Sequence, residues 1–171
     1  MAPRREVAES CLEFLYIELV QSYERKDAEC AEKGDGRASR AALESIGFQV
    51  GQQLAERYTI DRARFADHLE VIKFICKEFW SEIFRKQVDH LKTNRHRALF
   101  VLQDDRFRWL RHLSLPAEQT SNTEAVAKYL VFPCGLIKGA LSSFGVNCEV
   151  TAEISEDARK PTQCSFEVRI K

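Results

Sequence analysis

The sequence predicts an α+β domain in which helices pack against one face of a four-stranded antiparallel sheet. Long stretches repeat apolar residues at helical spacing, whereas two short C-terminal stretches alternate strictly between apolar and polar side chains. The predicted order is three or four helices, a hairpin, a helix and a second hairpin, which is typical of segregated helices and strands. The 171 residues contain no repeat or linker, so we expect one domain over 1–171.

The first helix is predicted over residues 6–33, which contain no Gly or Pro, and Gly34 and Gly36 mark its end. Its apolar residues form one stripe at helical spacing: Leu12, Leu15, Tyr16, Leu19 and Tyr23. Others extend that stripe around the helix: Val7, Cys11, Phe14 and Ile17. A helix packed on one core needs a single stripe. We therefore expect something else to cover a second surface of this helix.

The second helix is predicted from about Ser39. Its apolar stripe comprises Leu43, Ile46, Val50, Leu54 and Tyr58. Gly47 and Gly51 lie one turn apart on this stripe, although each glycine destabilises a helix by about 1 kcal/mol relative to alanine. Two glycines on one face predict a close backbone approach to a neighbouring element. Phe48 lies off the stripe, which is unusual for a large apolar residue on the surface of a monomer.

The later elements follow from the same two periodicities. An amphipathic helix is predicted around residues 72–84, and two strands at 98–102 and 107–110 around a Gln103–Arg106 turn. A capping box beginning at Ser121 opens a helix over 124–143, in which Pro133 predicts a kink or a break. Residues 146–154 and 164–170 alternate with period two, which predicts half-buried antiparallel strands.

Sites for catalysis, metals or cofactors are not apparent in the sequence. Asp104 and Asp105 are adjacent carboxylates, but their position between predicted strands favours turn residues over acid–base catalysts. The four histidines lack ligand spacing, no cysteines form a C-x-x-C pair, and no phosphate-binding motif occurs. We expect no metal, no cofactor, no enzyme activity and free thiols in a reducing compartment. A net charge of zero disfavours nucleic-acid binding.

The chain begins with a basic segment, but Glu9 and Glu13 interrupt the apolar residues after it, so no secretory signal is predicted. Residues 85–111 contain eight Lys or Arg and three Asp, which gives plus five. One interpretation is a basic patch that faces anionic membrane or an acidic partner. Its candidate residues are Arg95, Arg97, Arg106 and Arg108. The alternative is a solvated surface balanced by the acidic N-terminal helix.

Four collinear stretches resemble small subunits of the TRAPP vesicle-tethering complex: Ile46–Gln52, Lys73–Trp80, Phe100–Asp104 and Cys134–Leu141. The last resembles a signature of the Bet-three-like family, and the others its subunit-six branch. The resemblance runs from about residue 10 to the C-terminus. It implies an α/β-plait fold, and a scaffold subunit of a complex that tethers vesicles between the ER and the Golgi and activates a Rab GTPase. It places the chain in the cytoplasm, peripheral at ER and Golgi membranes.

The resemblance also implies a heterodimer with a paralogous TRAPP small subunit through the first two helices, within a complex of further TRAPP subunits. Self-pairing into a homodimer is the alternative for the isolated chain. The predicted partner-binding residues are Phe14, Leu15, Ile17, Leu43, Ile46, Phe48 and Val50. The sister subunit has an acylated cysteine just after its second helix, but Tyr58–Phe65 here contains none, so acylation is not transferred. A rival function is a lipid- or small-ligand-binding module of the same fold.

Overall fold

A computed structural model describes residues 7–29, 37–113, 122–155 and 162–171. The first two helices are α1 (Glu9–Glu29) and α2 (Arg37–Tyr58). A third, continuous helical segment follows, which consists of α3 (His68–Phe74), a π-helical turn (Ile75–Phe79) and α4 (Trp80–Phe84). β1 (His90–Asn94) and β2 (Leu99–Asp104) form a hairpin. α5 (Asn122–Ala127), a 3₁₀ turn (Lys128–Leu130) and α6 (Val131–Ser143) precede the hairpin of β3 (Cys148–Ile154) and β4 (Cys164–Ile170).

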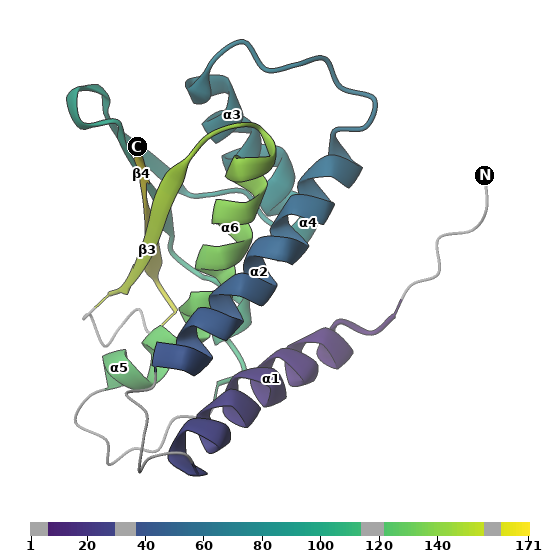
Figure 1. The fold of residues 1–171 in the computed structure, drawn as a ribbon, viewed down its shortest axis with the longest axis vertical. Coiled ribbons are helices and arrows are strands. Elements are labelled where there is room, and N and C mark those ends of the chain that lie inside the picture. Colours follow the sequence, from purple (N-terminus) through teal and green to yellow (C-terminus); the bar gives the residue numbers. More distant parts are fainter. Residues whose placement is uncertain (1–6, 30–36, 114–121, 156–161) are drawn as a thin grey trace.

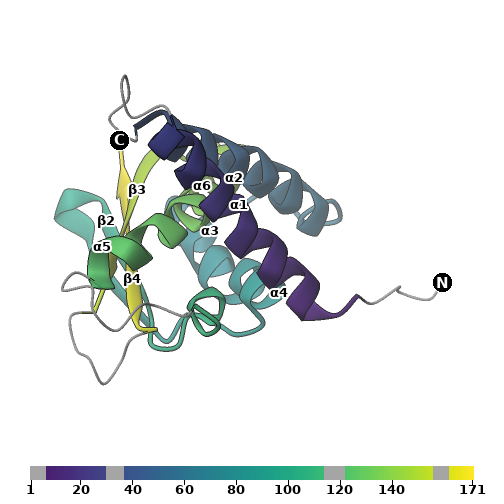
Figure 2. The same cartoon turned by 90° about the horizontal axis from the view of Figure 1, so that it is seen from below.

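The helices lie on one face of an antiparallel sheet with strand order β1-β2-β4-β3, so the predicted α+β architecture is confirmed (Figures 1 and 2). Cross-strand pairs such as Phe100 with Val168, and Val150 with Val168, fix the register of the central strands. These three side chains are buried, whereas the intervening residues point to the face that the helices leave open. The predicted alternation at the C-terminus therefore describes β3 and β4 correctly.

α2 and α6 cross at backbone contact, as the spacing of Gly47 and Gly51 predicts. A Cβ atom built at Gly51 would lie 2.0 Å from the carbonyl oxygen of Leu136. The relationship is reciprocal, because a Cβ at Gly139 of α6 would lie 2.0 Å from the carbonyl oxygen of Phe48. The crossing therefore fixes the position of α2 over α6, which in turn packs against β3.

The prediction for residues 98–110 is wrong in two respects. The hairpin partner of β2 precedes it, as β1, and the turn lies at 95–98 rather than at Gln103–Arg106. Residues 108–110 form a single 3₁₀ turn, because Phe107, Trp109 and Leu110 are all buried and do not alternate.

Asp104 is a buried structural residue and not a turn residue. Its carboxylate is fully buried and accepts hydrogen bonds from Trp80 Nε1 at 3.0 Å and Lys86 Nζ at 2.7 Å. Lys86 also bonds Asp89 at 2.5 Å. Burial alone lowers the pKa of Lys86, but these bonds outweigh it and raise that pKa above its ordinary value. The cluster joins α4 to the end of β2.

The predicted interruption of the helix over 124–143 is confirmed, but it lies at the 3₁₀ turn 128–130, before Pro133. The stretch Ala125–Ser143 is long and apolar enough to cross a membrane by length and composition, yet 67% of it is buried inside the fold. That degree of burial is typical of a core helix. The capping box at Ser121 falls outside the described residues.

Candidate partner-binding surface

α1 is attached to the fold by a narrow inner stripe. Tyr16 and Val20 are its buried members, at 5% and 0% exposure. The Tyr16 ring packs against Trp109, with centroids 5.0 Å apart, and against Phe132 at 5.7 Å. Burial raises the pKa of the Tyr16 phenol well above its ordinary value, so the hydroxyl remains a donor.

The hydroxyl of Tyr16 donates a hydrogen bond to the backbone carbonyl of Tyr129. In a regular helix that carbonyl would accept from the N–H of residue 133, but Pro133 has none. The interruption before α6 therefore leaves an acceptor that α1 uses. The bond explains how a proline inside a helix contributes to docking a separate helix.

A group of ion pairs holds the N-terminal half of α1. Arg108 pairs with Glu9, and its Nε lies 3.8 Å from Glu13 Oε1. Arg85 Nε lies 3.9 Å from Glu9 Oε1, and His112 Nε2 lies 3.5 Å from Glu13 Oε2. Carboxylates on α1 thus face two arginines and a histidine, which come from the end of α4 and from the segment after β2. The pair of Arg85 with Glu9 is exposed, and exposed pairs are individually worth about 0.2–1 kcal/mol.

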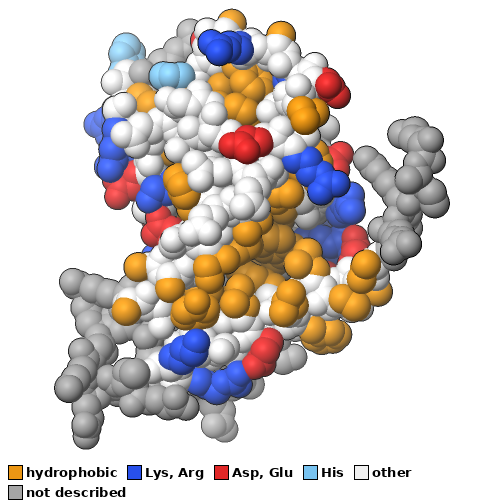
Figure 3. All heavy atoms as spheres, turned by 45° about the vertical axis from the view of Figure 1, so that its right-hand side comes forward, with side chains coloured by type: hydrophobic (Ala, Val, Ile, Leu, Met, Phe, Trp, Pro, Cys, Tyr) orange, Lys and Arg blue, Asp and Glu red, His pale blue; other side chains and the backbone are white. Residues whose placement is uncertain are grey.

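The outer face of α1 is apolar and exposed. Phe14 and Leu15 are 67% and 66% exposed, Leu12 is 55% exposed, and Val7 just before the helix is 77% exposed. Figure 3 shows hydrophobic side chains gathered over α1 and in the hollow between α1 and α2. Large apolar side chains this close together usually mark an interaction site.

A groove of about 400 Å³ lies beside this face, between α1, α2, α4 and α6. Its apolar lining includes Leu12, Val50, Leu54, Ile83 and Phe132. Glu9, Glu13, Arg85 and Arg108 also line it, so the ion pairs that hold α1 border the groove. Leu12 belongs to both the exposed face and the groove, which makes the two continuous.

The predicted partner-binding residues divide into three groups in the structure. Phe14 and Leu15 are exposed, as a contact surface requires. Ile17, Ile46, Phe48 and Val50 are half-buried, and Ile17 and Val50 pack against the core. Leu43 is only 4% exposed, so its inclusion needs correction: it packs within the chain and presents no surface to a partner.

The four candidate arginines of the basic patch do not gather at one place. Arg97 precedes β2 and Arg106 follows it, so the length of the strand, about 20 Å, separates them. Arg108 is engaged by Glu9 and Glu13, as the alternative of charge balance by the acidic helix predicts. The side chain of Arg95 lies outside the described set. The candidate basic patch is thus divided.

Sequence reasoning missed two parts of this surface. Helical spacing places Tyr58 on the stripe of α2, but this residue is 38% exposed and lines the groove. The anchoring role of Glu9 and Glu13 was also missed, although their spacing of four places them on one side of a helix. That spacing is the available signal; their partners come from segments more than 70 residues away, beyond the reach of helical periodicity.

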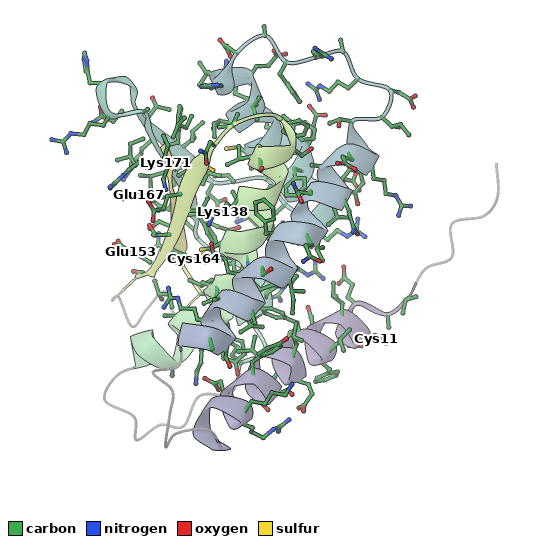
Figure 4. All side chains as sticks on the ribbon, in the orientation of Figure 1. Cys11, Lys138, Glu153, Cys164, Glu167 and Lys171 are labelled. Atoms are coloured by element: carbon green, nitrogen blue, oxygen red, sulfur yellow. The ribbon has the colours of Figure 1, made fainter. Side chains whose placement is uncertain are left out.

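The cysteine on α1 differs in exposure from the cysteines in the rest of the described fold. The five cysteines among the described residues are free; Cys11 on α1 is exposed, and Cys76, Cys134, Cys148 and Cys164 are buried (Figure 4 labels Cys11 and Cys164). Burial raises the pKa of Cys76 and of Cys134 to about 12. In the described part of the chain, no three His, Cys, Asp or Glu side chains are grouped to hold a metal ion.

Comparisons with known proteins identify the family of this chain. A family model described as "Transport protein particle (TRAPP) component" matches residues 12–171. Trafficking protein particle complex subunit 6b of Danio rerio is 45% identical over 163 residues, covering 95% of this chain and 97% of that protein. Subunit 6B of Mus musculus is 48% identical over 146 residues (85% of this chain, 87% of that protein), and subunit 6A of Homo sapiens is 40% identical over 159 residues (92% and 94%).

A solved structure with the same fold is that of trafficking protein particle complex subunit 3 from Naegleria fowleri, covalently bound to palmitic acid. Its TM-score is 0.61 at 16% identity, and the match covers 93% of this chain and 96% of that one. This likeness concerns the fold, whereas the family model and the sequence relatives concern descent. The chain therefore belongs to the family of TRAPP components, and within that family to the subunit-six type.

Proposed function

We propose that this chain is a non-catalytic scaffold subunit that pairs with a paralogous TRAPP small subunit through α1 and the adjoining face of α2. Membership of the family makes it a component of a vesicle-trafficking complex. Under the proposal, that complex tethers vesicles in ER-to-Golgi transport and activates a Rab GTPase by nucleotide exchange. The chain would act in the cytoplasm, peripheral at Golgi and ER membranes. Its contribution to nucleotide exchange would be structural, through its pairing with the paralogous subunit.

The observation that carries the proposal is the exposed apolar face of α1. Phe14 and Leu15 are two-thirds exposed on a helix whose inner stripe already completes its contact with the fold. Burying an aromatic side chain removes about 150–250 Å² from water, which is worth several kcal/mol at about 25 cal/mol per Å². A partner with an apolar helix of its own would cover both residues and the neighbouring groove.

Co-expression of the tagged chain with the other small TRAPP subunits of its organism tests the proposal. Phe14→Ser combined with Leu15→Ser should abolish stable pairing in size-exclusion chromatography. Anchors at an interface centre contribute about 2 kcal/mol or more each, so affinity should fall by at least about tenfold. Because both side chains face solvent in the single chain, circular dichroism should show an unchanged α+β fold.

Ile60→Ser provides a matched control. Ile60 is 82% exposed, lies beyond the end of α2, and is not among the residues that line the groove. This variant should retain its partner at full strength. Loss of pairing in the control, or retention in the folded double variant, would contradict the assignment of α1. Sedimentation of the isolated chain decides whether the same face forms a homodimer, which the double variant would then also lose.

A second candidate function is binding of an apolar ligand in the groove. Its volume of about 400 Å³ lies within the range of small-molecule sites, about 300–1,000 Å³, and much of its lining is apolar. The subunit 3 structure holds palmitic acid covalently, whereas the segment 58–65 here has no cysteine, so only non-covalent binding is considered. Native mass spectrometry would detect a retained ligand. Leu12→Gln with Leu54→Gln should release it; a purified chain of bare mass would argue against this candidate.

A further inference from the structure

β1 forms an edge of the sheet, and none of its residues lines the groove beside α1. The strand order places only β2 beside it. In an antiparallel edge strand, alternate residues direct their N–H and C=O groups away from the paired neighbour. Within the described part of the chain, no segment other than β2 pairs with β1. Its outer edge is therefore open to backbone hydrogen bonding.

The chain around β1 is cationic and lacks a compensating acid. From His90 to Gln103 it contains three Lys or Arg and no Asp or Glu. Lys92 and Arg97 are exposed, and neither has an ion pair with a described residue. At the opposite end of the strand, His90 Nε2 lies 3.6 Å from Asp105 Oδ2. The unopposed positive charge thus extends from the middle of β1, at Lys92, to the hairpin tip, at Arg97.

The sheet offers Lys92 no close carboxylate in its own row. The register aligns Lys92 with Val101 and then with Glu167, two strands away, at about 9.5 Å. Glu167 accepts a bond from Arg169 at 2.9 Å, and it lies on the side of the sheet away from α2 and α6 (Figure 4). The pairing capacity of Lys92 therefore remains available for a group brought from outside.

The two faces of β1 differ in polarity. Leu91 is half-buried and packs against the core, whereas Lys92 points to the open face of the sheet. An added strand would place alternate side chains beside Leu91 and beside Lys92. The first set suits apolar residues and the second suits carboxylates. A lysine on an edge strand ordinarily discourages pairing with a similar edge, but the same charge favours an acidic strand.

We propose that the open edge of β1 binds an extended acidic segment of a partner protein as an additional strand. Backbone hydrogen bonds supply the affinity, and Lys92 and Arg97 select carboxylates on alternate residues of the segment. An anionic membrane is the weaker match, because it makes no use of the backbone edge, and because Arg106 and Arg108 lie at the other end of β2. This surface is distinct from α1, so its test does not depend on pairing.

The test uses the full chain and a fluorescent peptide, Glu-Val-Glu-Val-Glu-Val-Glu, with blocked ends, in an anisotropy titration. Two further peptides carry N-methyl groups on all valines or on all glutamates. In a strand, the N–H groups of alternate residues point to opposite edges. One methylated peptide should therefore lose binding by at least about tenfold while the other keeps it. Equal affinity of all three would overturn strand addition, as would no binding of the unmodified peptide.

Charge reversal tests the selecting residues. Lys92→Glu with Arg97→Glu should lower the affinity for the peptide by about tenfold or more. Lys73→Glu with Lys77→Glu makes the same change of charge at two exposed helical positions and should leave binding intact. Vesicles containing phosphatidylserine, and sedimentation of the chain alone, complete the design. The proposal is overturned if the Lys92/Arg97 variant loses vesicle binding or self-association but binds the peptide like the wild type.

Discussion

α2 and α1 are attached to the fold in opposite ways. α2 meets α6 through glycines on both helices, so the two backbones touch and each helix fixes the other. α1 is held by Tyr16, Val20 and a border of ion pairs, and it keeps an exposed apolar face. The first contact completes the single chain. The second positions a helix whose outer face is left for something outside the chain.

The largest expected effect comes from breaking the α2–α6 contact. Gly51→Ala adds a Cβ atom 2.0 Å from the Leu136 carbonyl oxygen, and the obstruction is backbone, which cannot rotate away. We expect the free energy of unfolding to fall by about 3 kcal/mol, even though alanine favours a helix by about 1 kcal/mol over glycine. Urea denaturation followed by circular dichroism measures the change.

Gln53→Ala, two residues further along the exposed side of α2, is the control and should be neutral or slightly stabilising. A Gly51→Ala protein as stable as the wild type would show that α2 and α6 separate easily. In that case the contrast between the two helices would disappear.

The next effect concerns the docking of α1. Tyr16→Phe removes the hydroxyl that donates to the Tyr129 carbonyl and leaves a buried acceptor unpaired. The free energy of unfolding should fall by about 1–2 kcal/mol. Tyr23→Phe on the same helix should change stability little, because that side chain is half-buried and its hydroxyl has no hydrogen bond with a described residue. Equal stability of both variants would mean that the bond to Tyr129 adds nothing to docking.

The smallest effect is a difference in thiol reactivity between α1 and the rest of the fold. Iodoacetamide at pH 8 should alkylate exposed Cys11 at least about tenfold faster than Cys76 or Cys134, since burial protects these thiols and raises each pKa to about 12. Peptide mass mapping identifies the labelled sites. Addition of the small-subunit partner should then slow Cys11 selectively. Labelling of Cys76 as fast as Cys11 would show that the core opens often enough to expose its buried thiols.

Elements with strong periodicity were predicted well. β3 and β4 alternate because one face packs on α6 and the other is open, and the two glycines of α2 predicted a backbone contact that α6 confirms. β1 was missed because it is an edge strand with exposed His90, Lys92, Thr93 and Asn94, so burial imposes no alternation on it. Its hairpin turn was consequently placed after β2 instead of before it.

The candidate surface was predicted in part, for a similar reason. The excess apolar circumference of α1 indicated an exposed apolar face, because it depends on one helix alone, and Phe14 is exposed as expected. The division of residues was less accurate: Leu15 of the main stripe is exposed, whereas Ile17 of its extension packs against the core. The burial of Leu43, and the pairing of Arg108 with Glu9, depend on segments that meet only in the fold. Likewise, the hydrogen bond between Lys86 and Asp104 joins residues that are 18 positions apart. Neither helical nor strand periodicity indicates such a contact. The pairing role itself stays a prediction.

Hydrogen–deuterium exchange of the chain alone and in the assembled TRAPP complex tests the central claim most directly. We predict that amides of α1 exchange early in the isolated chain, because few buried side chains hold that helix. In the complex they should become strongly protected, together with the N-terminal half of α2, whereas α6 and β4 should be slow in both states. Unchanged exchange of α1 in the complex, with new protection elsewhere, would contradict the account.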